Sequence, residues 1–207
     1  MTSNGTLPGE DRFLLVSVST AGASASTRVR VWRKLRSLGA LYVQQSVCLL
    51  PDRDATRKQV RRLLASVRED GGTTRCLTIT VPDGGERADL VAEFNAERDT
   101  EYAEVVARAP ALLAELEAET ARGRVTYAEV EESEADLERF DRWMAKITDR
   151  DYFGAPGRKA AADAVEACRS ALEAFEAAAM AADTTDRSAV GPTDGRARTL
   201  RIVGEEG

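Results

Sequence analysis

The sequence predicts an α+β protein, in which a ferredoxin-like βαββαβ domain is followed by a C-terminal bundle of long helices. Strand and helix patterns alternate as far as Val81, whereas apolar residues recur only at helical spacing from Glu86 onward. The charge divides near the same point: residues 1–76 contain 13 Lys and Arg against 6 Asp and Glu, and residues 77–207 contain 16 against 29. We therefore expect four regions, which are a flexible N-terminus (1–11), the ferredoxin-like domain (12–84), a helical region (85–182) and a disordered tail (183–207).

Six short segments give the ferredoxin-like order of the first half. The run Arg12–Val18 is apolar and β-type, and a helix over residues 27–38 places apolar residues at i, i+4 and i+7 before the helix-ending Gly39. Further along, the patterns predict strands over 41–43 and 46–50, a helix with Asp54 as its N-cap, and an alternating strand over 75–81. Right-handed crossovers place both helices on one face of the sheet. We expect the rest of the chain or a partner subunit to cover the other face.

The second half reads as long helices separated by recognisable breaks. Pro110 is expected to kink or divide the segment from Glu86 to Arg122. Thr126 and Glu129 have the spacing of a capping box, which predicts that a helix begins there. The last helix is expected over about residues 158–182, and the TLRIV run in the tail could dock as an added strand.

Two acidic features of this half have both a structural and a metal-binding interpretation. The loop over residues 149–157 contains Asp149 and Asp151, which could bind a divalent cation. We favour a structural turn in which Tyr152 and Phe153 pack as anchors. The carboxylates between Glu129 and Glu138 alternate around a helix, which is typical of a solvated face.

The composition excludes several classes of catalytic site. The chain has no His, which excludes Ser-His-Asp and Cys-His catalysis and every zinc site that needs imidazole. The three cysteines form no CxxC pair, and neither GxxxxGK[ST] nor GxGxxG occurs. The first eleven residues lack the basic and apolar regions of a secretory signal, and no run approaches the length of a membrane span. We expect a cytoplasmic protein with no metal, no cofactor and no membrane contact.

The strongest functional feature is a set of basic residues on the outward faces of the two predicted helices of the first half. If both helices lie on one sheet face, their outer sides form one cationic patch that suits a phosphate backbone. The residues expected to bind nucleic acid are Arg30, Arg33, Lys34, Lys58, Arg61 and Arg62. The alternative is a solvated face whose charge is neutralised by the acidic helices.

The loop Ser17–Thr27 is a second candidate, because it is rich in hydroxyl and glycine residues and leads into a helix start. Unpaired N–H groups at a helix N-terminus beside arginine can bind an oxyanion or a phosphate. The residues expected to form this anion site are Ser24, Ser26, Thr27 and Arg28. Many ordinary loops have a similar composition, so a purely structural loop is the alternative.

Three separated motifs resemble the N-terminal domain of the chromate-resistance protein ChrB. They are Val29–Ala40 (VRVWRKLRSLGA), the hairpin through Val47–Pro51 (VCLLP) and Asp149–Gly154 (DRDYFG), and the similarity spans residues 12–180. The resemblance implies a regulator of chromate-resistance operons. It also implies similarity of the βαββαβ part to PaaX-type repressors and to small CRISPR-associated endonucleases.

Two departures from these relatives bear on function. The longer ChrB proteins continue into a second domain that we do not find after residue 180, which puts inherited chromate sensing in doubt. The CRISPR-associated nucleases hold a metal through an aspartate at the end of the first strand. Here that strand ends in Val16-Ser17-Val18-Ser19, which disfavours a metal-dependent phosphodiesterase.

We therefore expect a non-enzymatic, ChrB-like regulator that forms a homo-oligomer and contacts nucleic acid, as in transcription or stress-response regulation. A homo-oligomeric protein–protein scaffold that does not bind nucleic acid is the alternative. A third possibility is an enzyme that acts on an oxyanion or phosphate ester through the Ser17–Thr27 loop, with a carboxylate or Lys as its base.

Overall fold

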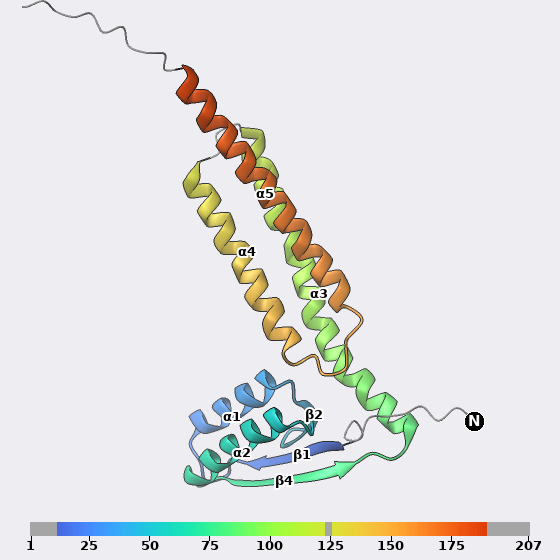
Figure 1. Ribbon diagram of the computed structural model, residues 1–207. Helices are drawn as coiled ribbons and strands as arrows, with labels where there is room; N and C mark the ends of the chain where they lie inside the picture. The colour runs from blue at the N-terminus through green and yellow to red at the C-terminus, as the bar shows by residue number, and fades with distance from the viewer. Residues whose placement is uncertain (1–11, 123–125, 190–207) are drawn as a thin grey trace, which may run out of the picture.

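The computed structural model describes residues 12–122 and 126–189, and its architecture is α+β, with strands in the first half and long helices after them (Figure 1). The strands are β1 (Arg12–Ser19), β2 (Leu41–Gln44), β3 (Val47–Pro51) and β4 (Thr73–Thr80). The helices are α1 (Ala25–Ser37), α2 (Asp54–Glu69), α3 (Gly84–Arg122), α4 (Tyr127–Thr148) and α5 (Arg158–Ala189). The four strands form one antiparallel sheet in the order β2-β3-β1-β4, which is the ferredoxin-like order. We call this sheet with α1 and α2 the head, and α3 to α5 the bundle.

One face of the sheet packs against α1 and α2. Alternate residues of β1, such as Leu14 and Val16, point to this face and meet Val31 and Leu35 of α1 and Val60 of α2 in a single buried cluster. Both helices therefore cover the same face, as right-handed crossovers require.

The opposite face of the sheet is covered only in part. The ring centroid of Phe13 on this face lies 6.1 Å from that of Phe94 in α3 and 6.3 Å from that of Phe153 in the loop after α4. The centroids of Phe94 and Phe153 lie 5.3 Å apart. The rest of the chain thus covers the end of the sheet nearest the bundle. Leu77 of β4 and Val43 of β2 stay exposed, at 55% and 47% of their surface.

The helix ends agree with the sequence analysis in two places and differ in one. Gly39 follows α1 with φ +72°, and Thr126 with Glu129 forms the full capping box of α4. Asp54, expected as the cap of α2, lies instead in its first turn, and the cap position is taken by Arg53, whose side chain makes no capping hydrogen bond. The acidic side chain still favours the positive end of the helix dipole.

The bundle helices are longer than the sequence pattern predicts. Pro110 does not divide α3, which is continuous from Gly84 to Arg122 with the proline on its exposed side. Helix α5 continues to Ala189, beyond residue 182 where the pattern placed the start of the tail. The remaining tail, with its TLRIV run, and the N-terminal residues 1–11 lie outside the described residues.

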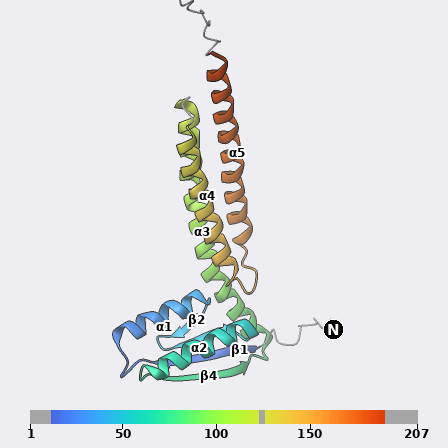
Figure 2. The same cartoon turned by 60° about the vertical axis from the view of Figure 1, so that its left-hand side comes forward.

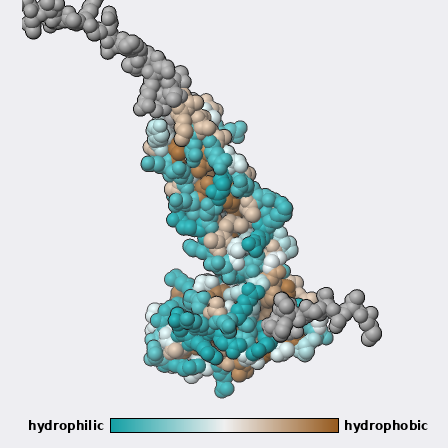
Figure 3. Space-filling view, viewed as in Figure 1, coloured by the Kyte–Doolittle hydropathy of each residue, from teal (hydrophilic) through white to brown (hydrophobic). Residues whose placement is uncertain are grey.

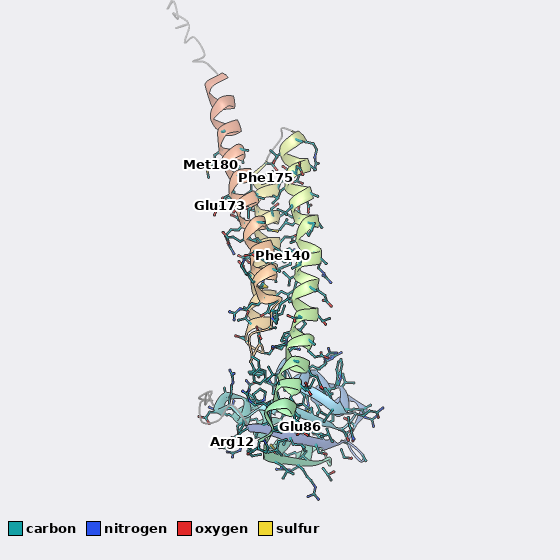
Figure 4. All side chains as sticks on the ribbon, turned by 90° about the vertical axis from the view of Figure 1, so that its right-hand side faces the viewer. Arg12, Glu86, Phe140, Glu173, Phe175 and Met180 are labelled. Carbon is teal, nitrogen blue, oxygen red and sulfur yellow. The ribbon has the colours of Figure 1, made fainter. Side chains whose placement is uncertain are left out.

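The bundle has its own apolar core. Helix α5 packs along both α3 and α4, and the three contribute buried side chains such as Tyr102, Leu112, Leu137 and Phe175. Figure 4 shows Phe140 and Phe175 within the bundle and Met180 near the far end of α5. Within the described chain, no helix combines the length and the hydropathy needed to cross a membrane.

The Asp149–Gly154 loop joins the head to the bundle. The Tyr152 hydroxyl donates to the Leu38 carbonyl at 2.7 Å, and the Arg53 guanidinium donates to the Tyr152 carbonyl at 2.6 Å and lies 5.0 Å from its ring. Asp151 accepts hydrogen bonds from the backbone N–H groups of residues 154 and 155 and from the Tyr102 hydroxyl. In the structure this motif is the structural turn that the sequence analysis favoured.

Candidate nucleic-acid interface

Helices α1 and α2 lie side by side on the head (Figure 2). All but one of their basic residues are exposed, and Arg57 is half-buried. The apolar stripe of each helix, which includes Val31 and Leu35 in α1 and Val60 and Leu64 in α2, is buried against the sheet. The residues on the opposite side of each helix therefore face outward. Helix α1 contains five Lys and Arg and no acidic residue, and α2 contains five against two acidic residues. This surface is therefore strongly cationic.

The predicted nucleic-acid residues cluster around a shallow groove between the two helices. Arg30 and Lys34 of α1 and Arg62 of α2 line this groove, which has a volume of about 320 Å³, together with Gln59 and Ser66. Arg33 lies on the adjoining outer face of α1, beside Arg30 and Lys34. We call the six predicted residues, Arg30, Arg33, Lys34, Lys58, Arg61 and Arg62, the basic ridge.

The other two members of the basic ridge extend it along α2. Lys58 is exposed one helical turn before Arg62, on the same face. Arg61 is exposed on the side of α2 that faces β4, where its charge acts on the Cys76 thiol. The structure thus places three of the six residues around one groove, Arg33 on the adjoining face of α1, and the other two on the flanking turns of α2.

Most cations of the basic ridge lack an acidic partner within the described part of the chain. Arg30 is the exception, since it forms an ion pair with Asp70, which follows α2. Lys34 donates a 2.8 Å hydrogen bond to the Gln59 amide oxygen, which is uncharged. None of the remaining four, Arg33, Lys58, Arg61 and Arg62, forms an ion pair with a described carboxylate. These side chains are available to an external anion.

The acidic helices do not cover the basic ridge. The bundle extends away from the head, and no described carboxylate of α3, α4 or α5 forms an ion pair with a cation of α1 or α2 (Figure 1). Side chains over α1 and α2 in Figure 3 are mostly hydrophilic. Neutralisation by the acidic helices, the alternative left open by the sequence, is not seen in the described residues of this chain.

The residues of the predicted anion site are largely engaged with one another. Ser24 caps α1 by accepting from the Thr27 N–H at 3.2 Å, and its hydroxyl also contacts that of Ser26 at 2.7 Å. The Thr27 hydroxyl donates to Asp70 at 3.0 Å. The carboxylate of Asp70 therefore lies where the sequence analysis placed an external anion. Arg28 differs from the other three, since it points away and donates to the Thr20 hydroxyl at 3.2 Å.

The sequence analysis missed a cleft of about 630 Å³ between α1 and the β2–β3 hairpin. Arg28 and Trp32 of α1 form one wall, and Tyr42 and Cys48 of the sheet form the floor. Burial is the main reason that the pKa of the Cys48 thiol and that of the Tyr42 hydroxyl are both raised to about 12. Both groups therefore stay protonated at neutral pH. The sequence signal that could have indicated it is the aromatic Trp32, which lies beside the apolar stripe of a helix rich in basic residues.

The described residues contain no cluster of three or more metal-ligating side chains. Asp151 is one of the two aspartates that the sequence offered as cation ligands. Its carboxylate accepts hydrogen bonds from two backbone N–H groups and a tyrosine hydroxyl. The acidic residues after Thr126 are mainly exposed along α4.

Comparison with known proteins assigns the chain to a family. Residues 28–186 match the family described as "Protein ChrB, N-terminal". The chain belongs to the ChrB N-terminal family. The matched residues begin inside α1 and end inside α5, so they include the basic ridge, the Asp149–Gly154 loop and the bundle.

A curated ChrB protein gives the same relationship at the level of one sequence. Protein ChrB from Cupriavidus metallidurans is 30% identical over 95 residues. The aligned part is 46% of this chain and 29% of that relative, so the chain spans less than a third of the relative that it matches.

Proposed function

We propose that this ChrB-family chain is a non-enzymatic regulatory protein, part of chromate-resistance control, that binds nucleic acid through the basic ridge. The observation that carries the proposal is the set of six cations on two adjacent helices. Among the described residues, five of them have no carboxylate partner, and four of those five make no side-chain hydrogen bond either. Family membership supports the regulatory role that the resemblance to ChrB implies.

The geometry favours contact with the phosphate backbone over reading of bases. The cations lie on the exposed sides of two helices packed along a sheet, and the sequence contains no helix-turn-helix pattern that would place a recognition helix in the major groove. Phosphate contacts position a protein on nucleic acid without reading the sequence. We therefore expect binding with little sequence preference from this part of the chain.

The test is binding of a fluorescein-labelled duplex of about two helical turns, followed by anisotropy at several salt concentrations. Each phosphate neutralised contributes about 0.9 to the slope of log K against log salt, so four free cations predict a slope of about −3 to −4. The double variant Arg33→Glu/Arg62→Glu is expected to abolish measurable binding at moderate salt. These two residues are chosen because Arg30 holds Asp70, and its reversal would place two carboxylates together.

A charge-matched control separates the basic ridge from a general effect of net charge. The variant Arg142→Glu/Lys146→Glu reverses two exposed cations on α4 and changes the net charge equally. It should bind the duplex as the wild type does. Equal losses in the two double variants, or affinity that does not depend on salt, would contradict the proposal.

Self-association through β4 is a second candidate function, favoured by a specific feature of the sheet. Strand β4 lies at the edge, has eight residues, contains no proline and has Arg75 as its one charged residue. Leu77 in its middle is 55% exposed. A long, unprotected edge with an exposed apolar side chain can pair with the same edge of a second copy.

Light scattering and cross-linking test this second candidate. A β4–β4 pair would bring the exposed Cys76 of two copies close together, whereas Cys48 and Cys168 are buried. Mild oxidation should then give a covalent dimer that Cys76→Ser abolishes, and Leu77→Lys should give a monomer. Val106→Lys, at an exposed apolar position on α3, is the matched control and should leave the oligomeric state unchanged. A monomer in the wild type would exclude this interface.

A further inference from the structure

The cleft beside α1 has the size and lining of a small-molecule site. Its volume of about 630 Å³ falls within the range of about 300–1,000 Å³ that is usual for ligand pockets. Its inner surface includes the apolar side chains of Val18, Val31 and Leu35, and Trp32 stands at its rim with 47% of its surface exposed. This combination suits a planar apolar group that can lie against an indole ring.

The charge of the cleft favours an anion. Arg28 is among the lining residues and no aspartate or glutamate is, while Arg36 holds its guanidinium 5.1 Å from the Trp32 ring. The Thr20 hydroxyl fixes the Nε of Arg28, and no described residue bonds its two terminal nitrogens. These are the nitrogens with which arginine binds a carboxylate, a sulfonate or a phosphate.

Neutral polar groups complete the lining. Tyr42, Gln45 and Ser46 contribute hydrogen-bonding side chains from the β2–β3 hairpin, and none of these side chains is hydrogen-bonded to another described residue. The protonated Tyr42 and Cys48 on the floor add no negative charge at neutral pH. An anionic ligand would therefore meet donors and no repelling group.

We infer that this cleft binds a planar organic anion, in which an aromatic ring lies against Trp32 and an anionic group is held by Arg28. The site is separate from the basic ridge, since Arg28 and Trp32 lie on the flank of α1 that faces the hairpin, whereas Arg30 and Lys34 face α2. Binding here does not depend on the proposed binding of nucleic acid.

The test uses the fluorescent probe 1-anilinonaphthalene-8-sulfonate, which combines aromatic rings with a sulfonate. We titrate the full chain and three variants, Arg28→Gln, Trp32→Ala and the double variant Arg33→Glu/Arg62→Glu. Arg28→Gln removes the charge but keeps an amide group at this position. It should lower the affinity for the probe about tenfold or more, as expected for loss of a charged hydrogen bond. Trp32→Ala should weaken it similarly, and the double variant should bind as the wild type does.

Competition identifies the ligand chemistry. Naphthoate should displace the probe, and inorganic phosphate at the same concentration should not, because the phosphate lacks the ring. Adenosine monophosphate distinguishes the two sources of a planar anion. If it displaces the probe, the site is assigned to nucleotides. If naphthoate displaces the probe and adenosine monophosphate does not, the site is assigned to aromatic acids.

Two results would overturn the inference. The first is unchanged probe affinity in both Arg28→Gln and Trp32→Ala. In that case a fourth variant, Leu77→Lys, shows by loss of probe binding whether the dye lies on the open sheet face instead. The second is displacement by inorganic phosphate as effective as that by naphthoate. Arg28 and Trp32 are exposed, so far-UV circular dichroism should show native folding in their variants; if Trp32→Ala does not fold, Arg28→Gln decides alone.

Discussion

At the scale of single residues, the junction between head and bundle imposes the strictest requirements. Gly39 ends α1 in the left-handed region, at φ +72°, and lies against the loop after α4. A Cβ atom there would lie 2.9 Å from the Cβ of Arg150 and 3.1 Å from its carbonyl oxygen. Only glycine satisfies both the backbone conformation and the close approach.

We predict that Gly39→Ala destabilises the protein by about 2 kcal/mol or more, since the left-handed conformation and the crowding each add a cost. Thermal unfolding followed by circular dichroism measures it. The control is Gly84→Ala at the start of α3, where a Cβ meets nothing within 4 Å and φ is not positive. Equal melting temperatures for the two variants would show that the junction tolerates a side chain at residue 39.

At the scale of elements, the far end of the bundle depends on the cap of α4. The Glu129 carboxylate accepts from the Thr126 N–H at 2.8 Å, and the Glu129 N–H donates to the Thr126 hydroxyl at 3.4 Å. The backbone and hydroxyl hydrogen bonds from Thr126 lower the pKa of Glu129. The cap therefore stabilises α4 most when this carboxylate is ionised.

The lowered pKa has a consequence for the dependence of stability on pH. The pKa of Glu129 is lower in the folded than in the unfolded state. The stability that its ionised carboxylate gives to the cap is therefore fully present above the unfolded pKa and is lost as the pH falls through the folded pKa. Glu129→Gln should therefore reduce the free energy of unfolding at pH 7. It should also make the free energy of unfolding fall less steeply at acid pH than it does in the wild type. Urea unfolding at pH 7 and below pH 4 measures both effects. Glu131→Gln, an exposed neighbour, is the control, and an identical pH profile in the two variants would contradict the prediction.

At the scale of the whole molecule, one carboxylate links helix α3 to the loop that follows α4, next to the head. Glu101 accepts from Arg98 at 3.2 Å and from Arg150 at 2.8 Å. Arg98 is 5% exposed, and burial lowers its pKa. Its guanidinium also lies where a side chain on Gly39 would be, so this network reaches the end of α1. Head and bundle each have an apolar core, and this network joins them together with the aromatic cluster around Phe13.

We predict that Glu101→Gln lowers stability by about 3 kcal/mol, because it leaves the buried Arg98 without its charged partner. The weakened junction should also separate one calorimetric transition into two, one for each core. Glu104→Gln, exposed on the same helix, should unfold as the wild type does. A single, unshifted transition in Glu101→Gln would show that the aromatic cluster around Phe13 is sufficient to couple the two parts.

The sequence pattern predicted the elements well because each has a local cause. The i, i+4, i+7 stripe of α1, the alternation in β4 and the capping box of α4 are all read within a few residues. The pattern was less accurate at the start of α2 and along α3. There, contacts between Arg53 and Tyr152 and the packing of α3 against α5 outweigh the local preference for a cap or a break.

In the candidate sites, too, local features could be predicted from the sequence, whereas contacts between distant segments could not. The outward position of the basic residues follows from helix periodicity, so the sequence was sufficient to place them on the surface. That Asp70 lies beside Thr27 and Arg30, and that Trp32 walls a cleft with Tyr42 and Cys48, depends on segments distant in the chain.

The sequence by itself determined the order of strands and helices, the two oppositely charged halves and the exclusion of imidazole chemistry, since these depend on composition and on short-range periodicity. Only the tertiary structure decided which cations lack a partner, which loop joins the head to the bundle and where a cleft remains. The physical reason is that ion pairing, burial and cavities arise between residues that are far apart along the chain, and one-dimensional spacing does not record those distances.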